Sequence, residues 1–284
     1  QKKTMKIFTW DGPKTIEMSP LDSVKHYLSM LNAGFLAMDP HNGYILAWVG
    51  GIDHRFFKYD HVTSKRQVGS TFKPFVYANA LKNGAKPCQY YPNDSIVYEA
   101  YDNWSPNNVS REYGGVYSLQ GALVNSVNTI SVQVLMEGGI DSTISLATDM
   151  GINTQFPKVP SLALGTMNAS VLDMAEAYSG FANQGRPLQG KALLRIENSE
   201  GKVLDKFKSE NKPKRVLDEQ VTEQITMMLN NVVKRGTARS LSSNFRFTGD
   251  VAGKTGTTQD HADGWFVGYT PNIVFASWVG AEYP

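Results

Sequence analysis

The strongest signal in this chain is a run of ten residues, Arg66-Gln67-Val68-Gly69-Ser70-Thr71-Phe72-Lys73-Pro74-Phe75. From residue 72 to residue 82 the apolar side chains fall on more than one helical face, a pattern typical of a buried helix. Proline at position 74 is compatible with the first turn of that helix, because the N–H it lacks would have no helical partner there. We therefore expect Ser70 at the entry to a buried helix, with Lys73 one turn further on.

This placement suits nucleophilic chemistry. A serine and a lysine one helical turn apart lie within hydrogen-bonding reach, so the amine could take the proton of the hydroxyl. Free N–H groups and the dipole at a helix entry favour a developing anion. The apolar neighbours Phe72, Phe75 and Val76 would lower the pKa of Lys73 from its usual value of about 10.4. The alternative interpretation is structural: Ser70 caps a helix and Lys73 extends beside it.

The Ser-x-x-Lys spacing alone is a weak signal, because it occurs three times in the sequence. Ser199 and Lys202 fall in a predicted hairpin turn, and Ser209 and Lys212 fall in a polar run, residues 208–214. Both of these pairs are interpreted as solvated loop residues.

Two further motifs lie downstream. Ser-x-Asn occurs four times, beginning at residues 105, 126, 209 and 242, whereas Lys-Thr-Gly occurs once. In chain order, Ser70-x-x-Lys73, Ser126-Val127-Asn128 and Lys254-Thr255-Gly256 form the serine–lysine set of penicillin-binding proteins and related β-lactamases. Ser126 falls between two predicted helices and Lys254 on a predicted strand, as a cleft between a helical region and a sheet requires.

The sequence around these motifs resembles the transpeptidase domain of class A, bifunctional penicillin-binding proteins. The resemblance extends from about Phe35 to Val279 and covers nearly the whole chain. It is carried by residues 66–75, Ser161-Leu162-Ala163-Leu164-Gly165, residues 253–258 and residues 263–270.

The resemblance implies a D,D-transpeptidase that cross-links donor and acceptor stem peptides of peptidoglycan. Ser70 would attack the penultimate D-Ala carbonyl and Lys73 would accept its proton. D-Ala would then leave, and an acceptor amine would resolve the acyl-enzyme. Ser126 would relay a proton to the leaving amine, with help from Lys254. A β-lactam would acylate Ser70 and inhibit the enzyme, because it mimics the end of the substrate.

The same resemblance implies how substrate is held. Lys254 and Thr255 would attract the terminal carboxylate through a charge-assisted contact, and their strand would pair with the extended substrate backbone. The backbone N–H groups of Ser70 and Thr257 would form an oxyanion hole, worth about 3 kcal/mol per donor. Asn128 would bind the substrate amide. The implied substrate-binding set is Asn128, Thr255, Gly256, Thr257 and Thr258.

Strand signals lie at both ends of the chain. Residues 35–39 and 44–49 flank an Asn42-Gly43 turn, and further strands are expected at residues 253–258, 264–269 and 273–279. The elements expected between them are helices at 119–125, 129–136, 142–150 behind an Asp141 N-cap, 170–184 and 218–235, and a hairpin of 192–196 with 202–207. This order predicts an α+β fold of the penicillin-binding and serine β-lactamase type, with a central antiparallel sheet completed by both chain ends around a largely helical middle. Residues 1–34 are expected to be a linker and the first elements, and residues 35–284 the transpeptidase domain.

Composition limits the other possibilities. The chain has 284 residues, 41% of them hydrophobic, and a net charge of +2, which favours a folded chain and disfavours a nucleic-acid partner. The single cysteine, Cys88, excludes an intrachain disulfide framework and a thiolate metal cluster. The five histidines form no metal-binding pair, so we expect neither metal nor cofactor. Residues 249–255 resemble a phosphate loop but have one residue too few between the glycines.

No apolar stretch is long enough for a membrane span, and the start lacks the features of a signal peptide. With the resemblance, this implies a glycosyltransferase domain and a membrane anchor elsewhere in a parent chain. The expected location is the extracytoplasmic face of the bacterial cytoplasmic membrane. The family usually continues into a terminal helix packed on the sheet, so we expect one apolar sheet face to be under-packed.

Three alternatives remain open at this stage. A D,D-carboxypeptidase differs in admitting water instead of an amine, which the sequence does not show. A class A β-lactamase uses a glutamate-activated water, and no Glu-x-x-Leu-Asn segment lies between Asn128 and Lys254. A non-catalytic domain that binds β-lactams and acts as a sensor would usually be fused to a signalling segment, and none is visible.

Overall fold

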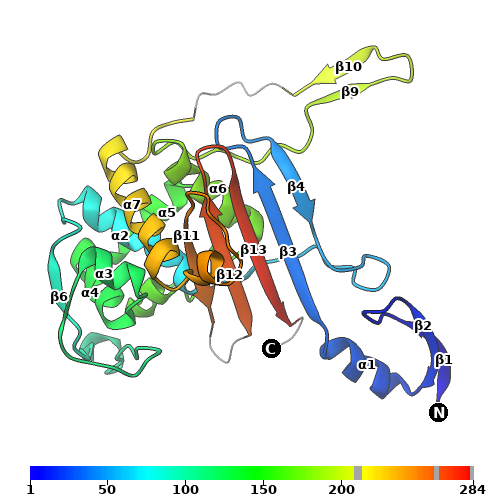
Figure 1. Ribbon diagram of the computed structural model, residues 1–284, viewed down its shortest axis with the longest axis horizontal. Coiled ribbons are helices and arrows are strands. Elements are labelled where there is room, and N and C mark those ends of the chain that lie inside the picture. The colour runs from blue at the N-terminus through cyan, green and yellow to red at the C-terminus, as the bar shows by residue number, and fades with distance from the viewer. Residues whose placement is uncertain (208–212, 259–261, 282–284) are drawn as a thin grey trace.

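The computed structural model describes residues 1–207, 213–258 and 262–281. Within these residues the centre of the fold is an antiparallel sheet of five strands, in the order β11-β12-β13-β3-β4 (Figure 1). The strands are β3 (Leu31–Met38), β4 (Ile45–Val49), β11 (Ala252–Thr257), β12 (Asp263–Tyr269) and β13 (Val274–Ala281). The predicted antiparallel sheet formed by both ends of the chain is confirmed.

The two ends of the chain meet along β3 and β13. These strands pair over eight residues, from Val274 opposite Met38 to Ala281 opposite Leu31. The inner face of the sheet packs on α6 (Val171–Ala182) and buries Trp278 completely. The outer face carries Phe266, Phe275 and Val279, which are half-buried or exposed.

The middle of the chain is helical, as predicted. Its helices are α2 (Lys73–Lys82), α3 (Leu119–Val124), α4 (Asn128–Gly138), α5 (Ile140–Asp149), α6, α7 (Glu219–Arg235) and α8 (Ser240–Ser243). The predicted bounds of these helices lie within two residues of the observed ones. The predicted N-cap of α5 is wrong, because the N-cap is Gly139 and Asp141 lies inside the first turn. The four-residue helix α8 was not predicted, since so short a turn leaves no periodic pattern.

Helix α2 lies at the centre of the helical region. Nine of its ten residues are buried, Lys73 among them, which confirms the buried helix expected from the sequence. Pro74 occupies the first turn. The helix begins one residue later than predicted, because Gly69–Phe72 form a separate 3-10 turn, η1, that leads into it.

Shorter elements surround this core. Two short strand pairs join β5 (Arg66–Gln67) to β8 (Asn168–Ala169) and β6 (Tyr90–Pro92) to β7 (Val116–Ser118), and the 3-10 turns η2 (Glu99–Tyr101) and η3 (Pro160–Leu164) complete the middle. The expected hairpin is present as β9 (Arg195–Glu197) and β10 (Val203–Lys206), and it projects from the body. Ser199 and Lys202 lie in its turn, whereas Ser209 and Lys212 fall outside the described residues.

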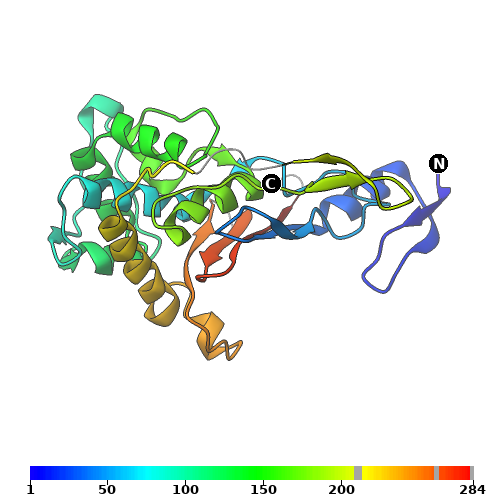
Figure 2. The ribbon, with the colours of Figure 1, turned by 90° about the horizontal axis from the view of Figure 1, so that it is seen from above.

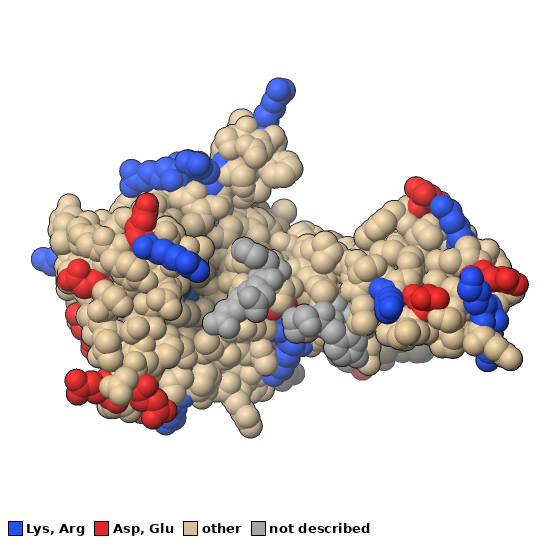
Figure 3. All heavy atoms as spheres, turned by 90° about the horizontal axis from the view of Figure 1, so that it is seen from below, with Lys and Arg blue, Asp and Glu red and all other residues tan. Residues whose placement is uncertain are grey.

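The N-terminal segment forms a projection at the end opposite the helices (Figure 2). It consists of β1 (Lys3–Ile7), β2 (Lys14–Met18) and α1 (Pro20–Leu28), and a small separate core of Phe8, Met30 and Phe57 joins it to the loop after β4. Its surface carries charges of both signs side by side (Figure 3). Among the described helices, none combines the length and the hydropathy that a membrane crossing requires.

Candidate active site

Ser70 lies in the 3-10 turn η1, directly before α2. Three hydrogen bonds fix this turn to other parts of the fold. Tyr178 donates its hydroxyl proton to the carbonyl of Thr71 at 2.7 Å, and the indole of Trp265 donates to the carbonyl of Gln67 at 2.9 Å. The N–H of Gly69 donates to the carbonyl of Gly165 at 3.1 Å. The serine is therefore held between α6, the sheet and the loop after η3.

Glycines allow this close packing. At Gly165, where φ is +74°, an added Cβ would lie 1.9 Å from the carbonyl oxygen of Gly69. A Cβ on Gly256 would lie 2.6 Å from the carbonyl oxygen of Val68. The glycine of the Lys-Thr-Gly motif thus lets strand β11 approach the nucleophile turn, which is a packing role.

Lys73 is fully buried and points toward the Ser-x-Asn motif. Its Nζ donates to the carbonyl oxygen of Ser126 at 2.7 Å, to Oγ of Ser126 at 3.1 Å and to Oδ1 of Asn128 at 2.7 Å. The motif residues predicted from sequence are therefore in contact. Ser126 lies in the link between α3 and α4 with φ of +56°, a left-handed conformation that costs a non-glycine residue about 1–3 kcal/mol.

The spacing puts Ser70 and Lys73 within hydrogen-bonding reach, but no hydrogen bond joins them in the described structure. Ser70 Oγ makes no hydrogen bond to any residue that the structure describes. Lys73 instead donates to Ser126 and Asn128. Ser70 lines the cleft.

Lys254 is also fully buried, on strand β11. Its Nζ donates to the carbonyl oxygen of Thr255 at 3.1 Å. The Thr255 hydroxyl lies 2.7 Å from that of Thr237, a residue in the loop after α7 that sequence reasoning did not single out. Among the described strands, β11 is an edge strand of the sheet, and none of them pairs with its outer side.

The end of β11 lies against the nucleophile turn. An added Cβ on Gly69 would lie 2.9 Å from the carbonyl oxygen and 3.3 Å from the nitrogen of Thr257, so the backbones of these two segments are adjacent. The next residue, Thr258, donates its hydroxyl proton to Asp263 Oδ2 at 2.9 Å and accepts from the Asp263 N–H at 3.0 Å. The indole N–H of Trp278 donates to Oδ1 of the same carboxylate at 2.8 Å.

All three motifs meet at one cleft of about 720 Å³. Ser70, Ser126, Thr255, Thr257 and Thr258 line it, together with Asn93, Asn108, Val109, Ser110, Glu112, Tyr117, Asn125, Val127 and Thr237. Behind this wall lie Lys73, Lys254 and Gly256, which are buried. The fold thus brings together Lys254-Thr255-Gly256, Ser70-x-x-Lys73 and Ser126-Val127-Asn128. These are the copies of each motif that were selected from the sequence.

The two lysines lie in an environment that favours their neutral forms. Burial, and then the positive charge of Lys254, lower the pKa of Lys73 well below its usual value. Burial lowers the pKa of Lys254 to about 7. A lowered pKa makes a lysine more able to be neutral and to accept a proton, so the site combines a serine hydroxyl with an amine suited to act as a base.

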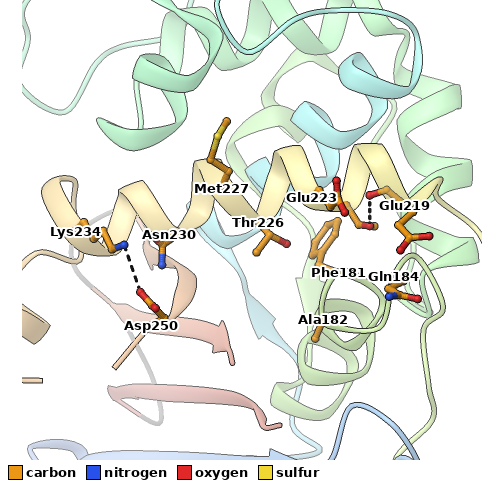
Figure 4. Close-up of a pocket in the computed structure, with 11 residues that line it drawn as sticks. Phe181, Ala182, Gln184, Glu219, Glu223, Thr226, Met227, Asn230, Lys234 and Asp250 are labelled. Atoms are coloured by element: carbon orange, nitrogen blue, oxygen red, sulfur yellow. Dashed lines mark hydrogen bonds and ion pairs between the residues drawn. The ribbon is translucent and has the colours of Figure 1, made fainter. Parts of the chain in front are cut away.

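A second hollow, of about 540 Å³, runs along α7 (Figure 4). Its lining includes Glu223, Thr226 and the exposed ion pair of Lys234 with Asp250 at 3.3 Å. None of the motif residues lines it, so it offers no serine–lysine chemistry. Among the described residues, no group of three or more histidine, cysteine, aspartate or glutamate side chains is placed to hold a metal ion.

A serine at the entry of a buried helix, beside buried lysines and the edge strand of an antiparallel sheet, defines the class of penicillin-binding and serine β-lactamase-like proteins. The comparisons agree. Residues 33–281 match the family described as penicillin binding protein transpeptidase domain, and residues 1–31 match the penicillin-binding protein middle domain.

Individual relatives are of the same kind. Penicillin-binding protein 1A of Rickettsia prowazekii is 33% identical over 89% of this chain and 35% of that protein, and its namesake in Neisseria lactamica is 34% identical over 90% and 33%. The crystal structure of penicillin-binding protein 1A from Haemophilus influenzae superimposes with a TM-score of 0.81 at 27% identity, over 89% of this chain and 43% of that one. The structure of PonA1 from Mycobacterium tuberculosis in complex with penicillin V superimposes with a TM-score of 0.76 at 27% identity. The match covers 92% of this chain and 73% of that one.

The chain belongs to the family of penicillin-binding protein transpeptidase domains, in the class A branch. It spans about a third of the length of the curated relatives it matches.

Proposed function

We propose that this chain is the D,D-transpeptidase domain of a class A peptidoglycan synthase and that it works through an acyl-enzyme on Ser70. The observation that carries the proposal is the convergence of three motifs on one cleft, with a free serine hydroxyl in front of two buried lysines. Family membership supports the same assignment.

In the acylation step, Ser70 Oγ attacks the penultimate D-Ala carbonyl of the donor stem and its proton passes to Lys73 Nζ. A neutral amine has two hydrogens and one lone pair. The two contacts of 2.7 Å, to the Ser126 carbonyl and to Asn128 Oδ1, use both hydrogens, and the lone pair remains for a hydroxyl proton. Ser126 Oγ, 3.1 Å from the amine, is placed to relay that proton to the departing D-Ala nitrogen.

In the second step, the amine of an acceptor stem attacks the acyl-enzyme carbonyl and loses a proton to the same base. The bond between the carbonyl carbon and Ser70 Oγ breaks, and the proton returns to Ser70 Oγ. Both steps pass through an oxyanion. We assign its stabilisation to the backbone N–H groups of Ser70 and Thr257, whose segments lie against each other.

Substrate recognition is assigned to the edge strand and the α4 entry. Thr255, Thr257 and Thr258 line the cleft along β11, and an extended peptide can add to that strand as a further strand. Lys254 and Thr255 attract the terminal carboxylate, Gly256 keeps the strand close to the nucleophile, and Asn128 holds the substrate amide as well as Lys73.

We propose that β-lactams acylate Ser70 and inhibit the domain. The support is the similarity to PonA1, whose structure was solved with penicillin V. The reaction needs no metal or cofactor, since both proton transfer and nucleophilic attack are assigned to side chains.

The remaining assignments follow from the class A family. We propose that residues 1–34 connect to a glycosyltransferase domain of the parent protein, that residues 35–284 form the transpeptidase domain, and that the domain acts on the extracytoplasmic side of the bacterial membrane. The partners are then donor and acceptor stem peptides.

Product analysis separates this proposal from a carboxypeptidase, a β-lactamase or a non-catalytic sensor. The chain is incubated with a stem pentapeptide, with and without an acceptor amine, and the products are separated by chromatography and mass spectrometry. A cross-linked dimer that depends on the acceptor is expected. Tetrapeptide alone would indicate a carboxypeptidase, rapid penicillin hydrolysis a β-lactamase, and stable acylation without any peptide product a sensor.

A further inference from the structure

A loop residue caps the N-terminus of α4 from a distance. The helix begins at Asn128, and the preceding Val127 offers no side-chain cap. Instead, Asn108 Oδ1 accepts hydrogen bonds from the backbone N–H of Asn128 at 2.9 Å and of Thr129 at 3.2 Å. The first N–H groups of a helix need such external acceptors, so Asn108 fixes where α4 begins.

The amide of Asn108 has no spare hydrogen-bonding group. Its Nδ2 donates to Asn93 Oδ1 at 2.7 Å and to the Glu112 carbonyl at 2.9 Å. Asn93 is held in turn by the hydroxyl of Thr129, which donates to its Oδ1 at 2.7 Å. Asn93 and Asn108 are 3% and 6% exposed. The orientation of the Asn108 amide is therefore fixed, and both of its hydrogens are committed to the protein rather than to a substrate.

The same loop orients the side chain of Asn128. The carbonyl of Asn107 accepts from Asn128 Nδ2 at 2.7 Å. With the nitrogen held there, Oδ1 faces Lys73 Nζ at 2.7 Å. The reverse orientation would place an NH2 group against the lysine amine. Asn108 thus binds the backbone of Asn128, and Asn107 binds its side chain. Asn128 in turn binds Lys73.

We propose that Asn108 is a positioning residue of the acyl-transfer reaction, which fixes the start of α4 so that Asn128 keeps Lys73 beside Ser126. The proposal rests on the proposed function. No hydrogen bond in the described part of the chain joins Asn108 to Ser70 or Lys73, so its effect passes through Asn128.

The test is a double-mutant cycle on acylation by a fluorescent penicillin, with each rate taken per folded protein. Asn108→Ala and Asn128→Ala are each expected to slow acylation by roughly tenfold, because they release Lys73 from its position. The double variant is expected to remain within about twofold of Asn128→Ala, since coupled residues do not add. Losses that multiply in the double variant would contradict the proposal.

Asn79→Ala is the matched control. Asn79 is equally buried and lies near the opposite end of α4, where its Nδ2 donates to the Gly138 carbonyl at 2.9 Å and its Oδ1 accepts from Ser142 Oγ at 2.8 Å. Its loss is expected to lower the urea midpoint while the folded protein acylates at the wild-type rate.

If Asn108→Ala does not fold, Asn93→Ala takes its place in the cycle, because it removes the anchor of the Asn108 amide and leaves the helix cap. A several-fold slower acylation that disappears in the Asn128→Ala background is expected. Wild-type rates in the folded Asn108 or Asn93 variants would overturn the proposal. Labelling of the wild-type chain at Ser70 in the same assay tests the proposed function separately.

Discussion

Two buried lysines share the base of the cleft, and the charge of one affects the other. Lys73 is held by Ser126 and Asn128, whereas Lys254 has a single carbonyl partner, that of Thr255. Burial disfavours the ammonium form of both. The charge of Lys254 thus lowers the pKa of Lys73, in addition to the binding of a substrate carboxylate that we propose for Lys254.

Lys254→Gln should move the acid limb of the acylation–pH profile to higher pH. Lys73 must be neutral to accept a proton, and the charge of Lys254 lowers its pKa. Without that charge the pKa of Lys73 rises, and acylation requires a higher pH.

The profile is measured as the rate of penicillin acylation between pH 5 and pH 10. Lys202→Gln, on the exposed hairpin turn, is the control and should keep the wild-type profile. An acid limb that stays in place or moves to lower pH would show that the two lysines are not coupled in this way.

For individual residues, the sequence predicted which residues belong to the site better than it predicted their contacts. The spacing of Ser70 and Lys73, with the unique Lys-Thr-Gly motif, singled out the residues that line or underlie the cleft. It did not indicate that Lys73 bonds to Ser126 rather than to Ser70. Asn93, Asn108 and Thr237 were missed, because the partners that tie them to the site lie 15 or more positions away and no local pattern marks them.

At the scale of elements, the site depends on how closely three backbone segments approach. The turn η1, the loop after η3 and strand β11 meet at Gly69, Gly165 and Gly256, where no side chain would fit. The helices that surround them were predictable from periodicity and from capping residues, as with the Ser170–Asp173 capping box of α6. Helix α5 was placed late because its N-cap is a glycine, whereas the capping preference favours an aspartate.

Gly165→Ala should reduce acylation by about 100-fold, because its methyl group would displace the nucleophile turn and a misplacement of about 1 Å has that order of effect. Its Cβ would lie 1.9 Å from the Gly69 carbonyl. The measurement is the rate of penicillin acylation per folded protein.

Gly84→Ala separates backbone strain from steric overlap. Gly84 also has a positive φ, +97°, but an added Cβ there would contact nothing within 4 Å. It should cost about 1 kcal/mol of stability and leave acylation unchanged. Equal acylation by the two variants would show that the Gly69–Gly165 approach does not position Ser70.

At the scale of the whole molecule, the two ends of the chain close one sheet. Strand β13 pairs with β3, and Trp278 covers the inner face between them. Its ring stacks on His61 with centroids 4.8 Å apart, its indole donates to Asp263, and Arg66 lies over it at 4.9 Å. Alternation and turn signals at both ends of the chain predicted the strands and a sheet completed by both ends. They did not give the order of the strands in the sheet, since periodicity does not specify partners.

Trp278→Ala should lower the free energy of unfolding by about 3–5 kcal/mol, as expected for a fully buried aromatic residue. The neighbouring Val279 points to the outer face and is 46% exposed, so Val279→Ala should change stability by only about 0.5 kcal/mol. Urea unfolding of both variants measures the difference. Similar losses in the two would contradict the assignment of inner and outer faces.

The central claim, that Ser70 is the acylated nucleophile, is tested most directly by peptide mapping after treatment with benzylpenicillin. The mass of a penicilloyl adduct is expected on the peptide that contains Ser70, and Ser70→Ala should carry no adduct while keeping the wild-type urea midpoint. An adduct on another residue, or equal labelling of Ser70→Ala, would contradict the account.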